Sequence, residues 1–219
     1  MRILIFLLTT SSLLIPFAAG EKAPPAPPVH QTIDLAIARG DLDDVRRHLE
    51  INPATLNQGA TEKSRPPLEQ AVLRNKQEIA MFLLDSGANP NTSDATRRTP
   101  LHLAIERNNP AVITALLKAG AKPGQLDKDG WTPLHHAAAK NQLATATALL
   151  AGGADVMTLS ELGGTPLHEA AASGGKEIVQ LLLDHKVDPS IKSKQDVTAL
   201  DIAKQYKNQP AIDLLSALK

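Results

Sequence analysis

Three histidines recur at equal intervals along the chain, at His102, His135 and His168. Imidazole binds transition metals and exchanges protons near neutral pH, so a recurring histidine raises the question of a zinc site or of general-base catalysis. A zinc ion requires ligand atoms that converge to about 2 Å from it. The elements that carry the three histidines therefore decide whether they can act together.

Each histidine ends the same motif, Thr-Pro-Leu-His. Full copies begin at Thr99, Thr132 and Thr165, and degenerate copies begin at Pro66 and Thr198. Threonine is favoured as an N-cap and proline at the first helical position, so each motif predicts the start of a helix. A constant period of about 33 residues with Thr-Pro-Leu-His resembles the ankyrin repeat.

This resemblance implies an all-α solenoid of about six helix-turn-helix repeats joined by hairpin-like loops. The repeats are expected to start near residues 31, 66, 99, 132, 165 and 198, in one ankyrin-repeat domain that spans residues 31–219. Repeats stack about 10 Å apart, so the three histidines cannot converge on one metal ion.

The resemblance instead implies that each imidazole bonds the hydroxyl of its own threonine and a neighbouring backbone carbonyl. His136, which directly follows a motif, is expected to point elsewhere. The residues expected to be structural are Thr99, His102, Thr132, His135, Thr165 and His168.

Catalysis finds no support in the chain. The sequence has no cysteine, no Gly-x-Ser-x-Gly, no phosphate-binding loop and no His-Glu-x-x-His. Glu161, Glu169 and Glu177 are interpreted as solvated surface charges. We expect a non-enzymatic protein with no catalytic residue, no metal and no cofactor, and the alternative is a hydrolase or metal enzyme.

A binding surface is the remaining candidate for function. Ankyrin partners usually contact the loop tips and the exposed side of the first helices. Carried over to this chain, those positions hold a column of basic residues with one tryptophan at its edge, which would suit an acidic protein surface. The expected partner-binding residues are Arg39, Arg65, Arg74, Arg98, Arg107, Trp131, Lys140 and Tyr206. Ordinary solubilising charges are the alternative.

The N-terminus has the pattern of a secretory signal peptide. Arg2 precedes an apolar run that Pro16 ends, and Ala18 and Gly20 place small residues before a cleavage point. Residues 1–20 are therefore predicted to be a signal peptide, with an uncleaved anchor as the alternative. Residues 21–30 contain four prolines and predict a stiff polyproline linker. The segment from Asn52 to Lys63 is predicted to be a longer exposed loop.

These features suggest a protein of the Gram-negative periplasm, or a secreted one, similar to exported bacterial ankyrin-repeat proteins. A formal net charge of zero argues against binding nucleic acid or a membrane surface. We expect a monomer that binds and stabilises or regulates another protein, such as a catalase. The alternatives are an immunity protein against a toxin and a secreted factor that acts on a host protein.

Overall fold

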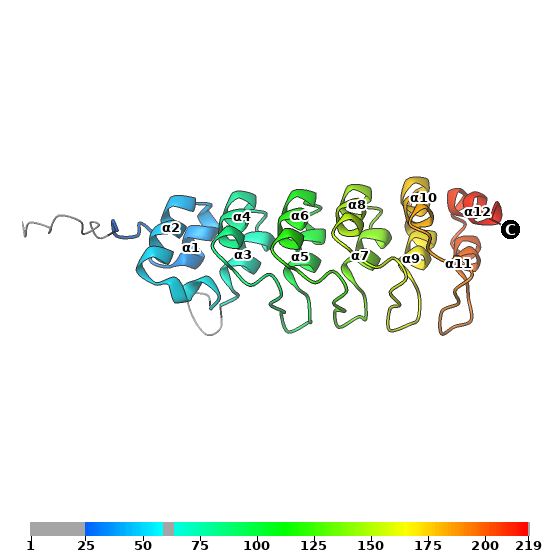
Figure 1. Ribbon diagram of the computed structural model, residues 1–219, viewed down its shortest axis with the longest axis horizontal. Helices are drawn as coiled ribbons and strands as arrows, with labels where there is room; N and C mark the ends of the chain where they lie inside the picture. The colour runs from blue at the N-terminus through cyan, green and yellow to red at the C-terminus, as the bar shows by residue number, and fades with distance from the viewer. Residues whose placement is uncertain (1–24, 59–63, 219) are drawn as a thin grey trace, which may run out of the picture.

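The computed structural model describes residues 25–58 and 64–218 of the chain. Within these residues, antiparallel helix pairs stack in a single row, with no strand among them (Figure 1). The elements are α1 (Ile33–Arg39), α2 (Leu42–Ile51), η1 (Pro53–Leu56), α3 (Pro67–Leu73), α4 (Gln77–Asp85), α5 (Pro100–Glu106), α6 (Pro110–Lys118), α7 (Pro133–Ala139), α8 (Leu143–Ala151), α9 (Pro166–Ser173), α10 (Lys176–Asp184), α11 (Ala199–Gln205) and α12 (Gln209–Ser216). The predicted all-α solenoid is confirmed. Repeat one is α1 with α2, and the numbering continues to repeat six, α11 with α12.

The core is a series of thin aliphatic layers. One alanine of each first helix from repeat two onward is fully buried, at the same position of every repeat: Ala71, Ala104, Ala137, Ala170 and Ala203. A methyl group at this position lets neighbouring helices approach closely, and leucine and isoleucine fill the space beside it. The chain therefore needs few aromatic rings in its core. None of the described helices is both long and apolar enough to span a membrane.

The repeating threonine and histidine tie each repeat to the next. The Nδ1 atom of His135 lies 2.7 Å from the Thr132 hydroxyl, and its Nε2 atom lies 3.0 Å from the carbonyl of Gly164, in the loop that leads to repeat five. His102 makes the same pair of contacts with Thr99 and the Trp131 carbonyl, and His168 with Thr165 and the Val197 carbonyl. These are the contacts that the resemblance implies. In repeat six Asp201 stands at the histidine position and caps its own helix only.

Burial makes these histidines difficult to protonate. It lowers the pKa of His102 to about 4 and that of His135 to about 4, and it also lowers the pKa of His168. An imidazole that accepts the amide N–H of its own threonine at Nδ1 would have to lose that bond to take up a proton there. The histidines are therefore neutral structural links at physiological pH.

The loops between repeats project to the same side of the stack (Figure 1) and are bonded to one another near their tips. The amides of Lys128, Glu161 and Lys194 each donate to a carbonyl of the preceding loop, at 3.0, 3.1 and 2.9 Å. The loops therefore form a connected ladder rather than independent fingers.

The end of the predicted linker is part of the first repeat. The amides of Val29 and His30 donate to the Asp44 carboxylate at 2.6 and 2.8 Å, and His48 Nε2 lies 3.0 Å from the His30 carbonyl. Val29 and His30, at the C-terminal end of the predicted linker, are therefore held against the first repeat, because Asp44 supplies acceptors for their backbone.

The predicted loop from Asn52 to Lys63 begins with a short helix. Pro53–Leu56 form the short 3₁₀ helix η1, whose first turn is capped by the Asn52 side chain. Residues 59–63 lie outside the described residues, as do the predicted signal peptide and residues 21–24 of the predicted linker.

The buried histidines predict acid sensitivity above the range in which carboxylates titrate. Their folded pKa lies below the unfolded value of 6.5, so the unfolded state binds more protons between about pH 6.5 and pH 4. The free energy of unfolding should therefore fall as the pH drops through this window, by about 3 kcal/mol for each of His102 and His135. Urea unfolding at pH 7.0 and pH 4.5 measures the change.

The matched variants are His135→Gln and His185→Gln. His135 is fully buried, whereas His185 is exposed at the end of α10. The His135 variant should show a weaker pH dependence than the unmodified protein, and the His185 variant should keep the full dependence. Equal pH dependence in all three proteins would contradict the assignment.

Candidate functional site

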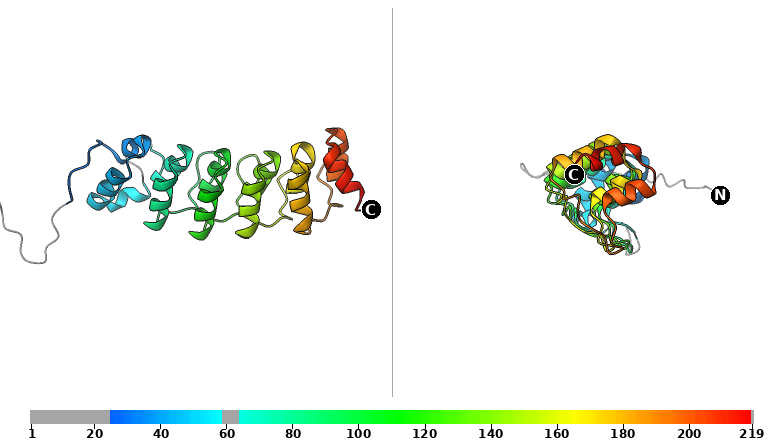
Figure 2. Two further views of the ribbon diagram at one scale, coloured as in Figure 1. Left: turned by 90° about the horizontal axis from the view of Figure 1, so that it is seen from above. Right: turned by 90° about the vertical axis from the view of Figure 1, so that its right-hand side faces the viewer.

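The first helices of the repeats and the projecting loops meet at an angle when the stack is viewed end-on (Figure 2). We call the surface inside this angle the inner face. It carries side chains from the first helices, from the loops and from the residues that precede each helix. The expected partner-binding residues stand either at the ends of the first helices or directly before the N-cap residues of those helices.

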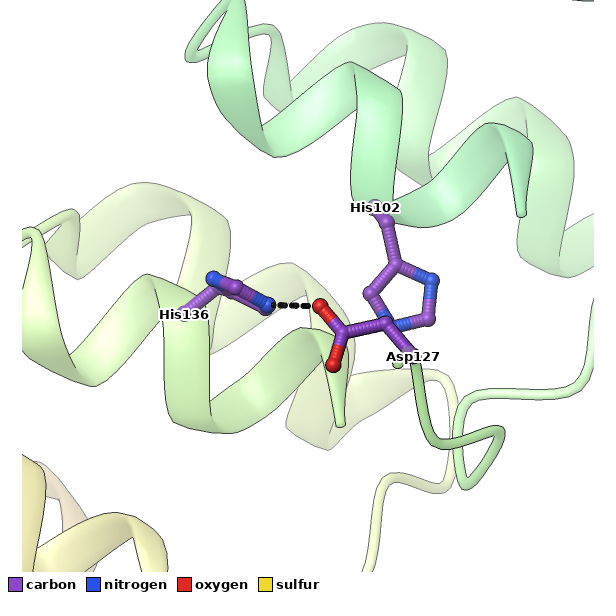
Figure 3. Close-up of side chains that lie close together, drawn as sticks. All are labelled: His102, Asp127 and His136. Carbon is purple, nitrogen blue, oxygen red and sulfur yellow. Dashed lines mark hydrogen bonds and ion pairs between the residues drawn. The ribbon is translucent and has the colours of Figure 1, made fainter. Parts of the chain in front are cut away.

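The centre of the inner face holds a cluster of two histidines and one aspartate. His102 comes from α5, His136 from α7, and Asp127 from the loop between α6 and α7 (Figure 3). His136 Nε2 lies 2.7 Å from Asp127 Oδ2, and one ligand atom of each of the three residues lies within 4.8 Å of the others. His136 therefore points at the loop of its own repeat and approaches His102 of the preceding repeat.

Asp127 is the organising group of this cluster. Its carboxylate is almost fully buried, and Oδ1 accepts the amides of Asp129 and Trp131 at 2.9 and 3.0 Å. Burial opposes ionisation, but the Trp131 amide and the His136 imidazole outweigh it and hold the pKa of the Asp127 carboxyl below its usual value. An ionised Asp127 thus fixes both the turn at the loop tip and the orientation of His136.

Trp131 packs against the histidines of this region. Its ring centroid lies 5.0 Å from that of His136 and 6.4 Å from that of His135. The Trp131 amide is bound by Asp127, and its carbonyl accepts from His102 at 3.3 Å. The side chain is half-buried, so one part of the indole packs on imidazole rings and the rest faces solvent.

Two histidines and a carboxylate are common zinc ligands, but the ligand atoms here are already engaged. His102 accepts the Thr99 amide at Nδ1, which leaves its Nε2 protonated towards the Trp131 carbonyl. Both oxygens of Asp127 are bound as well. A metal ion at His102 would have to break the helix cap of α5. The contacts of the cluster hold Trp131 in place and leave none of its converging ligand atoms free for a metal. We call this arrangement the clamp on Trp131. The second cluster, around Asp44, is likewise committed to backbone amides.

Two of the expected partner-binding residues are neutralised inside the chain. Arg65 lies 3.4 Å from Glu69 and 3.3 Å from Asp94. Arg98 lies 3.0 Å from Asp94 and 2.7 Å from Glu106. Despite its burial, hydrogen bonds from Thr96 and Arg98 hold the pKa of the Asp94 carboxyl far below its usual value. Arg65 and Arg98 therefore form a network that joins repeats two and three.

The other expected basic residues have no such compensation. Arg39, Arg74, Arg107 and Lys140 are exposed, one at the end of each first helix of repeats one to four. No ion pair joins any of them to another residue in the described part of the chain. Tyr206 occupies the equivalent place in repeat six and is 62% exposed. These five side chains are available to a partner.

The three glutamates expected to be solvated differ from one another. Glu161 is exposed and pairs with Arg97 at 3.1 Å, and Glu177 is exposed. Glu169 is half-buried, so its description as a solvated surface charge is wrong. It lies on α9, one full repeat after His136, and therefore takes the same place on the inner face.

Sequence reasoning missed the role of Asp94 and the contact between Asp127 and His136, although the turn from Asp127 to Gly130 can be predicted from its residues. Asp94 and Asp127 hold equivalent places in successive repeats, and in both the carboxylate accepts the amides two and four positions ahead. The signal was present in the repeat alignment, since an aspartate in the short loop before a helix N-cap is a typical turn former. That His136 would reach this carboxylate depends on the angle between loop and helix, which the sequence does not specify.

Comparison with protein families agrees with this architecture. The model for ankyrin repeats (3 copies) matches the chain at residues 33–127, 68–160 and 145–218, which together cover most of its length. The chain belongs to the ankyrin-repeat family. Ankyrin repeats bind other proteins and are generally non-enzymatic, so this protein is a protein–protein interaction module. No curated protein matches the chain.

The clamp on Trp131 predicts a specific loss of stability. Asp127→Ala leaves the Asp129 and Trp131 amides without their acceptor and should lower the free energy of unfolding by about 1–3 kcal/mol. Asp127→Asn keeps an acceptor oxygen for the two amides and should cost less. Urea unfolding followed by the fluorescence of Trp131, the single tryptophan of the chain, measures both.

The control is Asp129→Asn, because Asp129 is exposed in the same turn. This variant should match the unmodified protein. If Asp127→Ala were as stable as the unmodified protein, the carboxylate would not organise the turn.

Proposed function

We propose that this protein is exported to the periplasm, where it binds one partner protein on its inner face and stabilises or regulates it. The partner presents an acidic surface to repeats one to four. The observation that supports this proposal best is the column of Arg39, Arg74, Arg107 and Lys140, which is exposed and has no ion pair in the described residues.

The column residues differ from the two other expected arginines, which are paired within the chain. Arg65 and Arg98 are bound by acidic residues of their own chain, so their charges serve the fold. The column residues lie one repeat apart on the same edge, and their positive potentials add along it. A partner surface that carries carboxylates would be steered towards this edge, and binding would weaken as salt screens the interaction.

Trp131 supplies the apolar part of the proposed interface. Tryptophan and arginine are among the residues most often found at binding hot spots. The Asp127–His136 pair and the neighbouring imidazoles hold this indole before any partner arrives. A pre-positioned ring loses little conformational entropy on binding, so it is a favourable anchor.

The identity of the partner decides what binding achieves. An enzyme such as a catalase would make this protein a helper that protects or tunes it. A toxin would make it an immunity protein, and a host protein would make it a secreted effector.

Reversal of charge in the column should weaken binding. A photo-crosslinking residue in place of Trp131, in the full-length exported protein, captures the partner for identification. The affinity of that purified partner is then measured for the variant Arg74→Glu/Arg107→Glu, and we expect it to fall at least tenfold and to lose most of its salt dependence.

Lys118→Glu is the control, because Lys118 is exposed at the end of the outer helix α6. It also makes the net charge of the protein more negative, but on another face, and should leave the affinity for the partner within twofold. Unchanged affinity of the double variant for the partner would contradict the proposed role of the column.

Export predicts a defined mature N-terminus. Cleavage after Gly20 would make Glu21 the first residue of the protein recovered from the periplasm of a Gram-negative host, and intact mass spectrometry reads this directly. Gly20→Leu should accumulate the uncleaved precursor. Recovery of the full-length protein in the membrane fraction without cleavage would instead indicate an anchor.

A further inference from the structure

Glu169 differs from every comparable acidic residue of the structure. The other buried or half-buried carboxylates of the described residues all bind a cation, a side-chain amide or a backbone N–H; they are Asp34, Asp41, Asp44, Glu69, Asp94 and Asp127. The Glu169 side chain has no hydrogen bond and no ion pair within the described part of the chain. A carboxylate that has lost part of its water without gaining a partner destabilises the fold that holds it.

The neighbouring repeats show what is missing. In repeat four the inner face pairs a loop carboxylate with a helix imidazole, Asp127 with His136. At the same two positions repeat five has Ser160 in the loop and Glu169 on the helix. The buried Ser160 hydroxyl accepts the Gly164 amide at 3.2 Å, so Ser160 serves the turn. Repeat five therefore has an acidic member of this pair and lacks a basic one.

The position before each first-helix N-cap differs between the repeats. Repeats two, three and four carry Arg65, Arg98 and Trp131 there, and both arginines fold back onto glutamates of the following helix. Repeat five has Gly164 at this position. A Cβ atom on Gly164 would meet its nearest neighbours, His168 and Ser160, at 3.5 Å or more, which is ordinary contact. Repeat five therefore has no side chain at this position.

Burial also raises the pKa of the Glu169 carboxyl, which is the expected sign for a carboxylate without a cation. Ionisation therefore costs the free protein stability, and that cost is recovered when a positive charge arrives from outside.

We infer that Glu169 is a receptor for one cationic side chain, a lysine or arginine, of the partner protein. This inference rests on the proposed function, and it refines the partner: its surface is acidic opposite repeats one to four and carries a basic residue opposite repeat five. Two patches of opposite sign fix the direction in which the partner lies along the stack, which a single basic column cannot do.

The test compares Glu169→Gln, Gly164→Arg and the control Glu177→Gln in the mature protein. Two quantities are measured: the urea midpoint of the free protein at pH 7, and the affinity for the partner captured through position 131. Glu169→Gln should raise the midpoint and weaken binding by about tenfold, because it removes an unpaired charge from the free state and an ion pair from the complex. Glu177→Gln, at an exposed position of α10, should change neither.

Gly164→Arg supplies the missing cation from within the chain. It should raise the urea midpoint and also weaken binding, since the receptor is then occupied. In complexes formed by Glu169→Gln, replacing the partner's docked basic residue with glutamine should cost no further affinity, whereas the same change should weaken binding to the unmodified protein.

The outcomes separate this inference from the proposed function. Full affinity of Glu169→Gln alongside weak binding by Arg74→Glu/Arg107→Glu would overturn the receptor and leave the proposed function standing. A lower urea midpoint for Glu169→Gln would show that the chain already satisfies the carboxylate, and would also overturn the receptor. Full affinity in both charge variants would overturn the two proposals together.

Discussion

The structure depends on one short interaction, the bond that each motif histidine makes to the next repeat. A single helix pair of this size buries too little surface to fold alone, so its stability comes from its neighbours. The imidazole bridges its own helix cap to the loop that enters the next repeat, and His135 does so while fully buried. This bridge fixes the stacking distance, the direction of the loops and thereby the inner face.

The same geometry determines which side chains can serve a partner. Because the loops bond to one another near their tips and the first helices lie at a constant spacing, equivalent positions form straight columns along the stack. Some columns are used inside the chain, as at Arg65 and Arg98, and others are left open, as at Arg74 and Arg107. Single substitutions within a column therefore change which side chains are available to a partner, without any change in the backbone.

The fold could be predicted almost completely from the sequence, because the constant repeat period and the Thr-Pro-Leu-His motif specify helix starts directly. The capping role of His102 followed from the same motif. The site could be predicted only in part. That Arg98 is paired while Arg107 is free depends on the distance from each guanidinium to Asp94 and Glu106, and side-chain reach across a loop is not encoded in repeat spacing. Glu169 was misjudged for the same reason, since its burial arises from the packing of the repeats around it.

The joints between repeats are of two chemical kinds, and this gives the stack two different ends. From repeat three onward the joints are neutral imidazole bonds to carbonyl oxygens. Repeats one to three are instead joined through carboxylates, by Gln70 with Asp34 at 2.7 Å and by Arg65 with Asp94 at 3.3 Å. Ionic strength therefore acts on the Arg65–Asp94 pair between repeats two and three, and mild acidity acts on the imidazole bonds from repeat three onward. The two ends of one continuous solenoid are thus held to their neighbours by contacts that answer to different properties of the solvent.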